Sequence, residues 1–439
     1  MAADSAASTG SKIHKTADKL FTLSKYYPVG IMVYNSSAFM GVPWESIIKV
    51  FRNNFDKKHH PTLKEYADEF INSLDGNESI VSLSVQKQFF KLQVESYFNE
   101  LKESIKDFIK DQDETTKLAL NLVSVICPDS VDEDEESQEF DQLNKMLRTD
   151  LLKIHTENLK NKVMEDLGEL PEHFISDILG NKEYKEIIQN ASTKFFDDME
   201  FDNDPTEELG LVAVYGFCDT NSGVVIAGFG DDELYPSVIS YTICGMINNK
   251  LKILDNSNET ASIAIDDSAR IIPFAQHEMV DSFLEGVIPE YDEYSEGYLE
   301  RLFNDLPSTF LQIVEEVDDG TGSKLIDELK EKVQKIEEET KVLFDDYKNE
   351  MKNQKKKHEY PILMAVATLP KDDLASMAES LVHLTSLKRK FTFHEDETVG
   401  GAIDVAVISK GDGFVWIKRK HYFKAELNPQ FFNKYFYKL

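Results

Sequence analysis

Two charged residues near the start of the chain are the first candidates for chemistry. Asp4 lies just inside an apolar opening, and Lys19 stands 15 residues later at the head of an apolar run. A carboxylate and a lysine brought together form an ion pair, whose strength depends on how far it is withdrawn from water. At a strand edge such a pair only staples two strands and contributes little stability. A functional and a structural interpretation of Asp4 and Lys19 therefore both stay open.

Three other clusters have residue types that could do chemistry. His277 and Glu278 could form a catalytic pair on a helix, although a partly exposed helical histidine is the commoner case. Residues 394–396, His-Glu-Asp, could hold a metal or form a plain acidic loop, and the loop is favoured because no HExxH cluster occurs in the chain. Residues 228–230, Gly-Phe-Gly, lack the Lys and Ser that a phosphate-binding loop needs. We therefore expect no metal and no cofactor.

Charge excludes several partner classes. The 439-residue chain has 80 acidic and 48 basic residues, a formal net charge of -32. Such a field repels nucleic acid and anionic membrane surfaces unless a local basic patch compensates. The basic runs 355–358 and 388–390 are short, and we predict that they are solvated helix ends. No apolar span approaches the ~18 residues of a membrane helix. We expect neither a nucleic-acid nor a membrane partner.

The cysteines and the first residues bear on the compartment. Cys127, Cys218 and Cys244 show no CxxC spacing and cannot all pair with one another. That pattern is typical of a reducing compartment and disfavours a zinc site. No signal peptide is visible at Met1. The sequence therefore predicts a cytoplasmic protein.

The apolar periodicity predicts elements of both kinds around the first candidates. Residues 19–23 and 29–34 are apolar runs bounded by polar residues and proline, which is typical of the two strands of a hairpin. A helix is expected to begin near Pro43, because proline is favoured in the first turn and the following apolar residues share one face. Further strands are expected at 209–217, 223–229, 236–244, 251–254, 262–265, 402–409 and 414–418.

Helices are expected to fill the remainder of the chain. The turn at 410–413 should join the last two strands into a hairpin. Proline 307 should break or kink a helix over 299–315, and Gly286 should cap a helix that begins at Pro273. Apolar positions in 324–357 hold no strict heptad, so a helical hairpin arm is favoured over a long coiled coil. The other expected helices are 86–110, 115–126, 143–166, 171–179, 183–199 and 374–388; the run 358–369 fits either a strand or a helix.

Three separated segments resemble the proteasome-type branch of the N-terminal nucleophile (Ntn) hydrolases. Residues 2–5, Ala-Ala-Asp-Ser, resemble that family's Ala-Ala-Asp-Ser/Thr segment. Residues 19–23 resemble the strand headed by the family's lysine, and Gly30 falls where the family keeps a glycine in the next strand. Residues 396–401, Asp-Glu-Thr-Val-Gly-Gly, resemble its late Asp-x-x-Ser-Gly-Gly loop. Two shorter matches are the Asp-Gly-aromatic turn at 412–414 and the central strand and turn at 223–235.

The resemblance implies a fold, an α+β four-layer α-β-β-α sandwich, and it covers roughly half of the chain because two all-helical insertions have no counterpart. On this basis the sandwich core comprises residues 1–52, 206–290 and 359–425. The first insertion, 53–205, contains an acidic loop at 129–141. The second insertion or arm is 291–358, and 426–439 form a C-terminal tail.

The resemblance also implies roles for individual residues. In such a site a buried lysine stabilises developing negative charge and an aspartate keeps that lysine charged and oriented. Asp4, Lys19 and Asp396 are the candidates for these supporting catalytic roles. Gly30, Gly400 and Gly401 are the candidates for the substrate-binding side. Val399 stands where the family has a supporting serine, which departs from the pattern.

The attacking residue itself is not found. The family's nucleophile is an N-terminal Thr, Ser or Cys one strand upstream of the Ala-Ala-Asp segment, with its own amine as base. Here only Met1 stands there, and Ala2 has no nucleophilic group. Self-cleavage at residues 10–11, Gly-Ser, would discard Asp4. We therefore expect a protein related to peptidases or amidases, with a peptide or amide substrate if active. The alternative is a non-catalytic structural or regulatory subunit that forms homo-oligomers or binds a protein partner.

Overall fold

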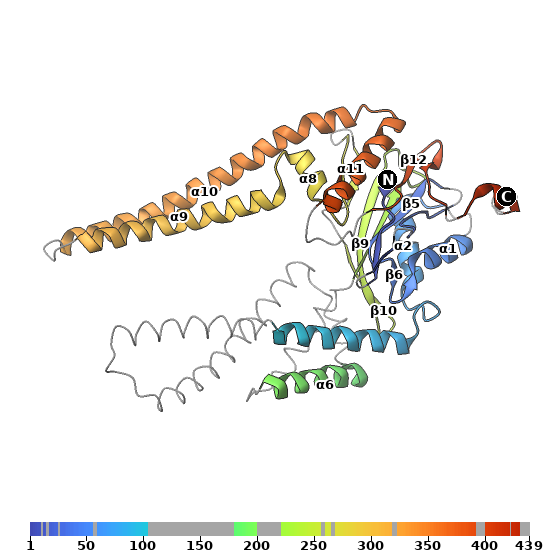
Figure 1. Ribbon diagram of the computed structural model, residues 1–439, viewed down its shortest axis with the longest axis horizontal. Helices are drawn as coiled ribbons and strands as arrows, with labels where there is room; N and C mark the ends of the chain where they lie inside the picture. Colours follow the sequence, from blue (N-terminus) through green and yellow to red (C-terminus); the bar gives the residue numbers. More distant parts are fainter. Residues whose placement is uncertain are drawn as a thin grey trace. The chain divides into compact units, whose positions relative to one another are not determined.

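The chain forms a mixed α+β protein whose strand pairings are antiparallel, as expected (Figure 1). The computed structural model describes residues 1–9, 12–14, 17–24, 27–55, 59–103, 180–199, 221–255, 260–264, 268–317, 323–391, 400–421 and 423–430. Of the expected elements, the helices at 115–126, 143–166 and 171–179, the acidic loop 129–141 and the strand 209–217 lie outside these residues.

The largest sheet has six strands in the order β10-β9-β8-β5-β4, with β11 also paired to β9. The predicted hairpin over 19–34 is confirmed, since Leu20 pairs with Met32 and Thr22 with Gly30. Val, Ile and Met side chains in β5 are buried, which is typical of a central strand. The strands are β4 (Leu20–Thr22), β5 (Val29–Asn35), β8 (Ser222–Gly228), β9 (Ser237–Ile247), β10 (Lys250–Asp255) and β11 (Ala261–Ser262).

A second sheet has the order β1-β12-β13 and joins the start of the chain to its end. Ala2 pairs with Val405 and Ala3 with Asp404. The predicted hairpin of the last strands is confirmed, and Gly413 supplies the positive φ of 75° that its turn needs. The strands are β1 (Ala2–Ala3), β12 (Asp404–Ser409) and β13 (Gly413–Lys418). Two further pairs are β2 (Ala7–Thr9) with β3 (Lys12–His14), and β6 (Ala38–Phe39) with β7 (Val42–Pro43).

The chain divides into two compact units. The first unit comprises Met1–Met32, Ala227–Val238 and Ala261–Leu439, and the second comprises Val33–Ile226 and Ile239–Thr260. Strands β5, β8 and β9 have residues in both. The division therefore passes through strands of the largest sheet, and the predicted core and insertions stay a prediction.

In the second unit, helices are fastened to the turn between β9 and β10. Asn248 and Asn249 adopt positive φ angles of 50° and 61°, which asparagine tolerates in tight hairpin turns. The backbone N–H of Asn248 donates to the Tyr184 hydroxyl at 3.0 Å, and that of Asn249 donates to Gln86 at 2.9 Å. The helices described in this unit are α1 (Trp44–Asn54), α2 (Leu63–Leu74), residues 83–103 and α6 (Lys182–Met199).

The helix expected near Pro43 begins at Trp44, so this prediction is confirmed. Trp44, Ile47 and Ile48 are buried along one face of α1. At α2 the Thr62 hydroxyl accepts from the backbone N–H of Glu65, as an N-terminal cap does.

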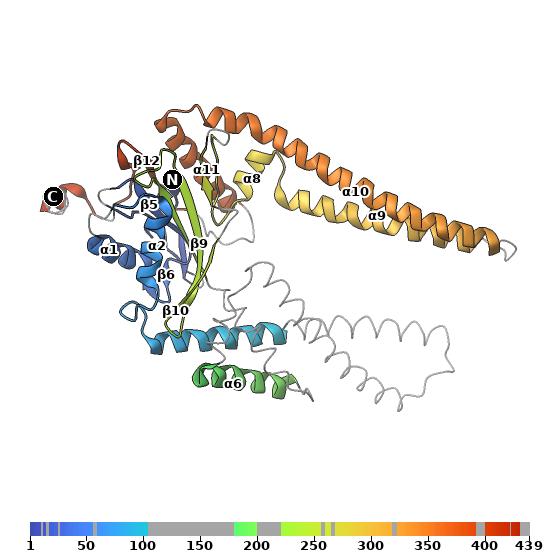
Figure 2. The same cartoon turned by 180° about the vertical axis from the view of Figure 1, so that it is seen from behind.

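In the first unit, two long helices form the predicted arm. Helices α9 (Pro289–Val317) and α10 (Ser323–Val366) run side by side in opposite directions (Figures 1 and 2). Of the break or kink expected at Pro307, the break does not occur, since α9 continues through this residue. The ambiguous run 358–369 is mostly helical and extends α10 to Val366. Together α9 and α10 are called the helical arm below.

Two further helices pack in the same unit: α8 (Glu278–Glu285) and α11 (Lys371–Phe391), followed by a short 3-10 turn at Ala425–Leu427. Gly286 ends α8 in the left-handed conformation, as predicted, but the start at Pro273 is wrong because residues 273–277 are not helical. Ala375 of α11 packs with Ile403 and Val405, so this helix covers the β1-β12-β13 sheet.

Candidate functional site

Asp4 is held rigidly where β1 ends. Its Oδ2 accepts from the backbone N–H of Gly400 at 2.8 Å and of Ala6 at 3.2 Å. The side chain is 10% exposed. A carboxylate that accepts backbone N–H bonds on one oxygen keeps the other oxygen free for a specific partner. That partner is supplied by the next strand.

Lys19 provides it from the residue before β4. Its Nζ donates to Asp4 Oδ1 at 2.6 Å, and its side chain is 17% exposed. An ammonium group has three N–H donors. Among the residues that the structure describes, Asp4 alone accepts from Lys19 Nζ. Asp4 therefore orients the Lys19 side chain, and the described residues supply one acceptor for its three donors.

Gly400 and its neighbours are the third part of this cluster. Gly400 and Gly401 have φ angles of 150° and 83°, a backbone path that glycine adopts without strain. Gly400 O accepts from the backbone N–H of Ser5 at 3.2 Å, so Gly400 exchanges bonds with residues 4 and 5 in both directions. The Ser5 hydroxyl donates to Ala402 O. The structure thus brings together Asp4, Lys19 and Gly400, which belong to the three segments singled out in the sequence.

The remaining predicted site residues fall in different places. Asp396 and Val399 lie outside the described residues. Gly401 is exposed beside Gly400. Gly30 is buried in β5, and a Cβ there would stand 2.8 Å from side-chain carbons of both Ile408 and Phe414. Gly30 therefore lets the β12-β13 hairpin pack closely on β5.

A second lysine cluster was not predicted. Lys420 Nζ donates to Ala17 O at 2.7 Å and to Asp404 Oδ2 at 2.9 Å, and it lies 3.1 Å from Asp18 Oδ1. Asp404 also accepts from the backbone N–H of Lys420 at 2.7 Å. The available signal was Asp404 itself, since a carboxylate opening an apolar strand needs a partner if the strand is buried.

The other sequence candidates form ion pairs rather than a catalytic set. His277 is exposed and its Nδ1 bonds to Asp281. Glu278 bonds to Lys388 at 2.6 Å, and this hydrogen bond lowers the pKa of Glu278. The prediction that the basic runs are solvated is wrong at Lys388 and at Lys355, which bonds to Asp292 at 2.5 Å. Burial alone would lower the pKa of Lys355, but its hydrogen bonds to Asp292 and Glu285 raise it.

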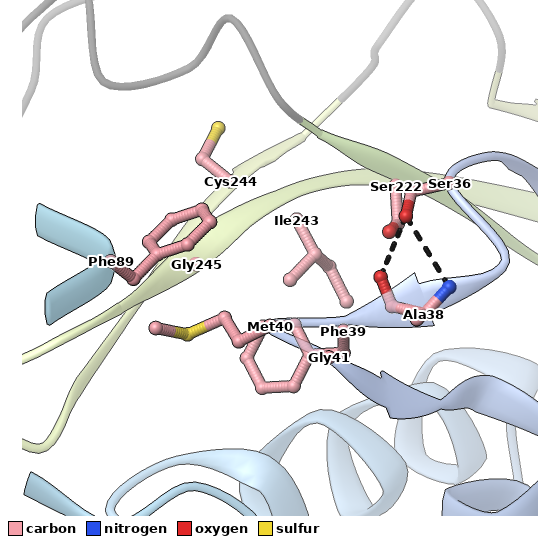
Figure 3. Close-up of a pocket in the computed structure, with 10 residues that line it drawn as sticks. All are labelled: Ser36, Ala38, Phe39, Met40, Gly41, Phe89, Ser222, Ile243, Cys244 and Gly245. Atoms are coloured by element: carbon pink, nitrogen blue, oxygen red, sulfur yellow. Dashed lines mark hydrogen bonds between the residues drawn. The ribbon is translucent and has the colours of Figure 1, made fainter. Parts of the chain in front are cut away.

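The second unit contains a small pocket of about 170 Å³ (Figure 3). Figure 3 shows the Ser36 hydroxyl bonded within its own turn, donating to Ala38 O at 2.7 Å and accepting from Ala38 N at 3.3 Å. Among the residues that the structure describes, none with a charged side chain lines it, so these residues offer shape but no acid or base. The lining residues are Ser36, Ala38, Phe39, Met40, Gly41, Phe89, Ser222, Ile243, Cys244 and Gly245.

One cysteine corrects an expectation. Cys244 is disulfide-bonded, which does not fit the reducing compartment expected from the cysteine pattern. Because the odd count of three allows one disulfide, cysteine number is a poor guide to pairing here. The argument from the cysteines to a reducing compartment loses its basis.

The fold and the cluster define a mixed α+β protein with a lysine-aspartate pair at the meeting of three chain segments. No protein-family model, curated protein sequence or solved structure matches the chain significantly. Within the described parts of the chain, no helix has both the length and the apolar character to cross a membrane. The same residues contain no group of three or more metal-binding side chains.

Proposed function

We propose that this protein is related to the proteasome-type Ntn hydrolases and retains the charged residues that line one side of their active site. We call this cluster of Asp4, Lys19 and Gly400 the charged wall. The observation that carries the proposal is the carboxylate of Asp4. Its two oxygens connect Lys19, at 2.6 Å, with Gly400, at 2.8 Å. Three segments that resemble the family at separate points of the sequence thus meet at one side chain.

The chemistry of the wall follows from its donors. Lys19 presents a fixed positive charge that stabilises negative charge on an attacking oxygen or on a carbonyl oxygen during attack. Asp4 prevents Lys19 from rotating away, since its second oxygen is anchored to the backbone. A peptide or amide is the substrate class that suits such a site.

The described residues place no nucleophile in this wall. No hydroxyl or thiol among them bonds to Lys19 Nζ, and the Ser5 hydroxyl is engaged with Ala402 O. We therefore propose a wall that is retained without an attacking group. The four-layer sandwich is the fold that goes with this proposal, and the two larger antiparallel sheets are consistent with it.

The proposal that the attacking group is missing is tested with an electrophile. The purified protein is incubated with a peptide epoxyketone, which captures N-terminal nucleophiles, and its intact mass is measured beside an active proteasome β subunit. We expect an adduct on the β subunit alone. If an adduct forms, it is measured again in the variants Lys19→Met and Lys371→Met. Lys371→Met is the control, because Lys371 makes an exposed ion pair with Asp412. An adduct lost only in Lys19→Met would show a working enzyme.

The proposed relationship to the Ntn hydrolases is tested by an experimentally determined structure. We expect two packed sheets between helical layers, with Asp4, Lys19 and Gly400 in contact. A different arrangement of the sheets would overturn the relationship whatever the electrophile shows.

A second candidate function is a structural or regulatory subunit that binds a protein partner. The helical arm favours it, because α9 has large apolar side chains exposed to solvent. This candidate needs no nucleophile and is compatible with a retained wall.

A further inference from the structure

One face of α9 is an exposed aromatic stripe. Its members follow one another at steps of three and four residues, so they share one side of the helix. Each side chain is between 39% and 67% exposed. Tyr294 and Tyr298 stack with their ring centroids 6.4 Å apart. The stripe consists of Tyr291, Tyr294, Tyr298, Leu302 and Leu306.

The contacts described between α9 and α10 use other residues of α9. The rings of Phe303 and Phe344 have centroids 6.0 Å apart, and Asp292 bonds to Lys355 at 2.5 Å. Pro307 is buried. Much of the surface of the five stripe side chains therefore remains open to a partner.

The composition and length of the stripe fit one helix of a partner. Five large apolar side chains in a row exceed the scattered exposure of an ordinary surface. Tyrosine is enriched in protein interfaces because a rigid apolar ring carries a polar tip. From residue 291 to residue 306 the stripe extends for about 22 Å, or roughly four helical turns. An amphipathic helix of similar length would cover it.

Charge selects the kind of helix. Residues 289–306 contain six carboxylates and one arginine, Arg301. A second copy of this chain would bring the same acidic segment and a net charge of -32 to the interface, which disfavours self-association. Lysine and arginine side chains, in contrast, are attracted both to carboxylates and to the faces of tyrosine rings.

We propose that the aromatic stripe of α9 binds a basic amphipathic helix of another protein. The apolar side of that helix packs on the tyrosine rings and the two leucines, and its lysines or arginines lie over ring faces and acidic side chains. This inference rests on the second candidate function and is independent of the wall around Lys19. Failure here leaves the electrophile test and its outcome unaffected.

Peptide binding to designed variants tests the stripe. The probe is a fluorescein-labelled, 18-residue helical peptide of leucine and lysine, and its affinity for the full chain is measured by fluorescence anisotropy. The Tyr294→Gln/Tyr298→Gln variant breaks the stripe. The control, Val342→Gln/Leu343→Gln, replaces two apolar side chains of α10 that are 60% and 57% exposed. Both variants keep the net charge, so general attraction to an acidic protein is matched.

We expect the stripe variant to bind the peptide about tenfold more weakly, as loss of a central aromatic pair does, and the control to bind almost as wild type. Equal weakening in both variants, or none in the stripe variant, would overturn the proposal. Circular dichroism checks that both variants remain helical. Sedimentation of the wild type is a further arm: a dimer that disappears in the stripe variant would identify a second copy as the occupant and also overturn it.

Discussion

Two lysine-aspartate pairs of the first unit, Lys19–Asp4 and Lys420–Asp404, differ in how many partners each lysine has. Lys420 Nζ donates to Ala17 O and Asp404 Oδ2 and forms an ion pair with Asp18 at 3.1 Å. Lys19 has one acceptor among the described residues, Asp4. Within the described part of the chain, Lys420 is thus held by three partners and Lys19 by one.

The two carboxylates differ in how far each depends on its lysine for hydrogen bonds. Asp404 is the more deeply buried, with 4% of its side chain exposed, and it depends on Lys420 for bonds to both oxygens. Asp4 is held by two backbone N–H groups even without its lysine. The Lys420–Asp404 pair therefore stabilises the fold, whereas the Lys19–Asp4 pair is a preformed charged group. The difference predicts which substitutions damage stability and which do not.

The largest effect is expected for Lys420→Met. The substitution keeps the length of the side chain and leaves Asp404 buried with a single backbone donor, so the variant should lose about 3 kcal/mol of unfolding free energy. Urea denaturation followed by circular dichroism measures it. The exposed pair Lys371–Asp412 is the control, and Lys371→Met should unfold at the wild-type midpoint. A Lys420→Met variant with that same midpoint would remove the structural role assigned to Lys420.

Lys19→Met is expected to cost less, about 1 kcal/mol, because Asp4 keeps two backbone N–H bonds. The same denaturation experiment applies. The comparison fails if Lys19→Met is as damaging as Lys420→Met. In that case the pair at Asp4 would be a staple, and the interpretation as a functional wall would lose its support.

Ser5→Ala separates the ion pair from the backbone clamp beside it. The variant loses the hydroxyl bond to Ala402 O but keeps the two bonds that link residues 4 and 5 to Gly400. A single neutral hydrogen bond contributes about 1 kcal/mol. Thermal or urea unfolding should show a loss of this size, additive with Lys19→Met in the double variant. A clearly non-additive result would mean that Ser5 and Lys19 act as one unit.

Local patterns in the sequence predicted most of the elements that the structure describes around these pairs. The hairpin from Lys19 to Tyr34, the start of α1 at Trp44 and the cap at Gly286 all depend on neighbours in sequence. The start of α8 was wrong because apolar residues after Pro273 fit a helical stripe, while Ala275 has a φ of 67° and His277 precedes the first turn. Periodicity alone does not register such a backbone reversal.

Long-range partners were harder to predict. Asp4 and Lys19 were paired by resemblance, and Gly400 fell beside them although 396 residues separate it from Asp4. Lys420 with Asp404 was missed, because both lie at the ends of neighbouring strands and their meeting depends on register. Lys355 and Lys388 were expected in solvent because a run of basic residues carries no information about a carboxylate on another helix.

Lys388 and Glu278 extend the comparison to a pair between helices α11 and α8, whose side chains are 28% and 27% exposed. The hydrogen bond to Lys388 lowers the pKa of Glu278. A carboxyl with a lowered folded-state pKa contributes stability that is complete above its unfolded pKa of about 4.3 and is lost as the pH falls through the folded value. Solvent screening keeps the contribution near 0.5 kcal/mol.

The substitution Glu278→Gln should therefore destabilise the protein slightly at pH 6, and the difference from wild type should shrink as the pH falls below the unfolded pKa of about 4.3. Urea midpoints of both proteins across this pH range give the difference directly. If the difference grew towards low pH, the carboxylate of Glu278 would be unfavourable in the folded state, and the third pair would not belong with the other two.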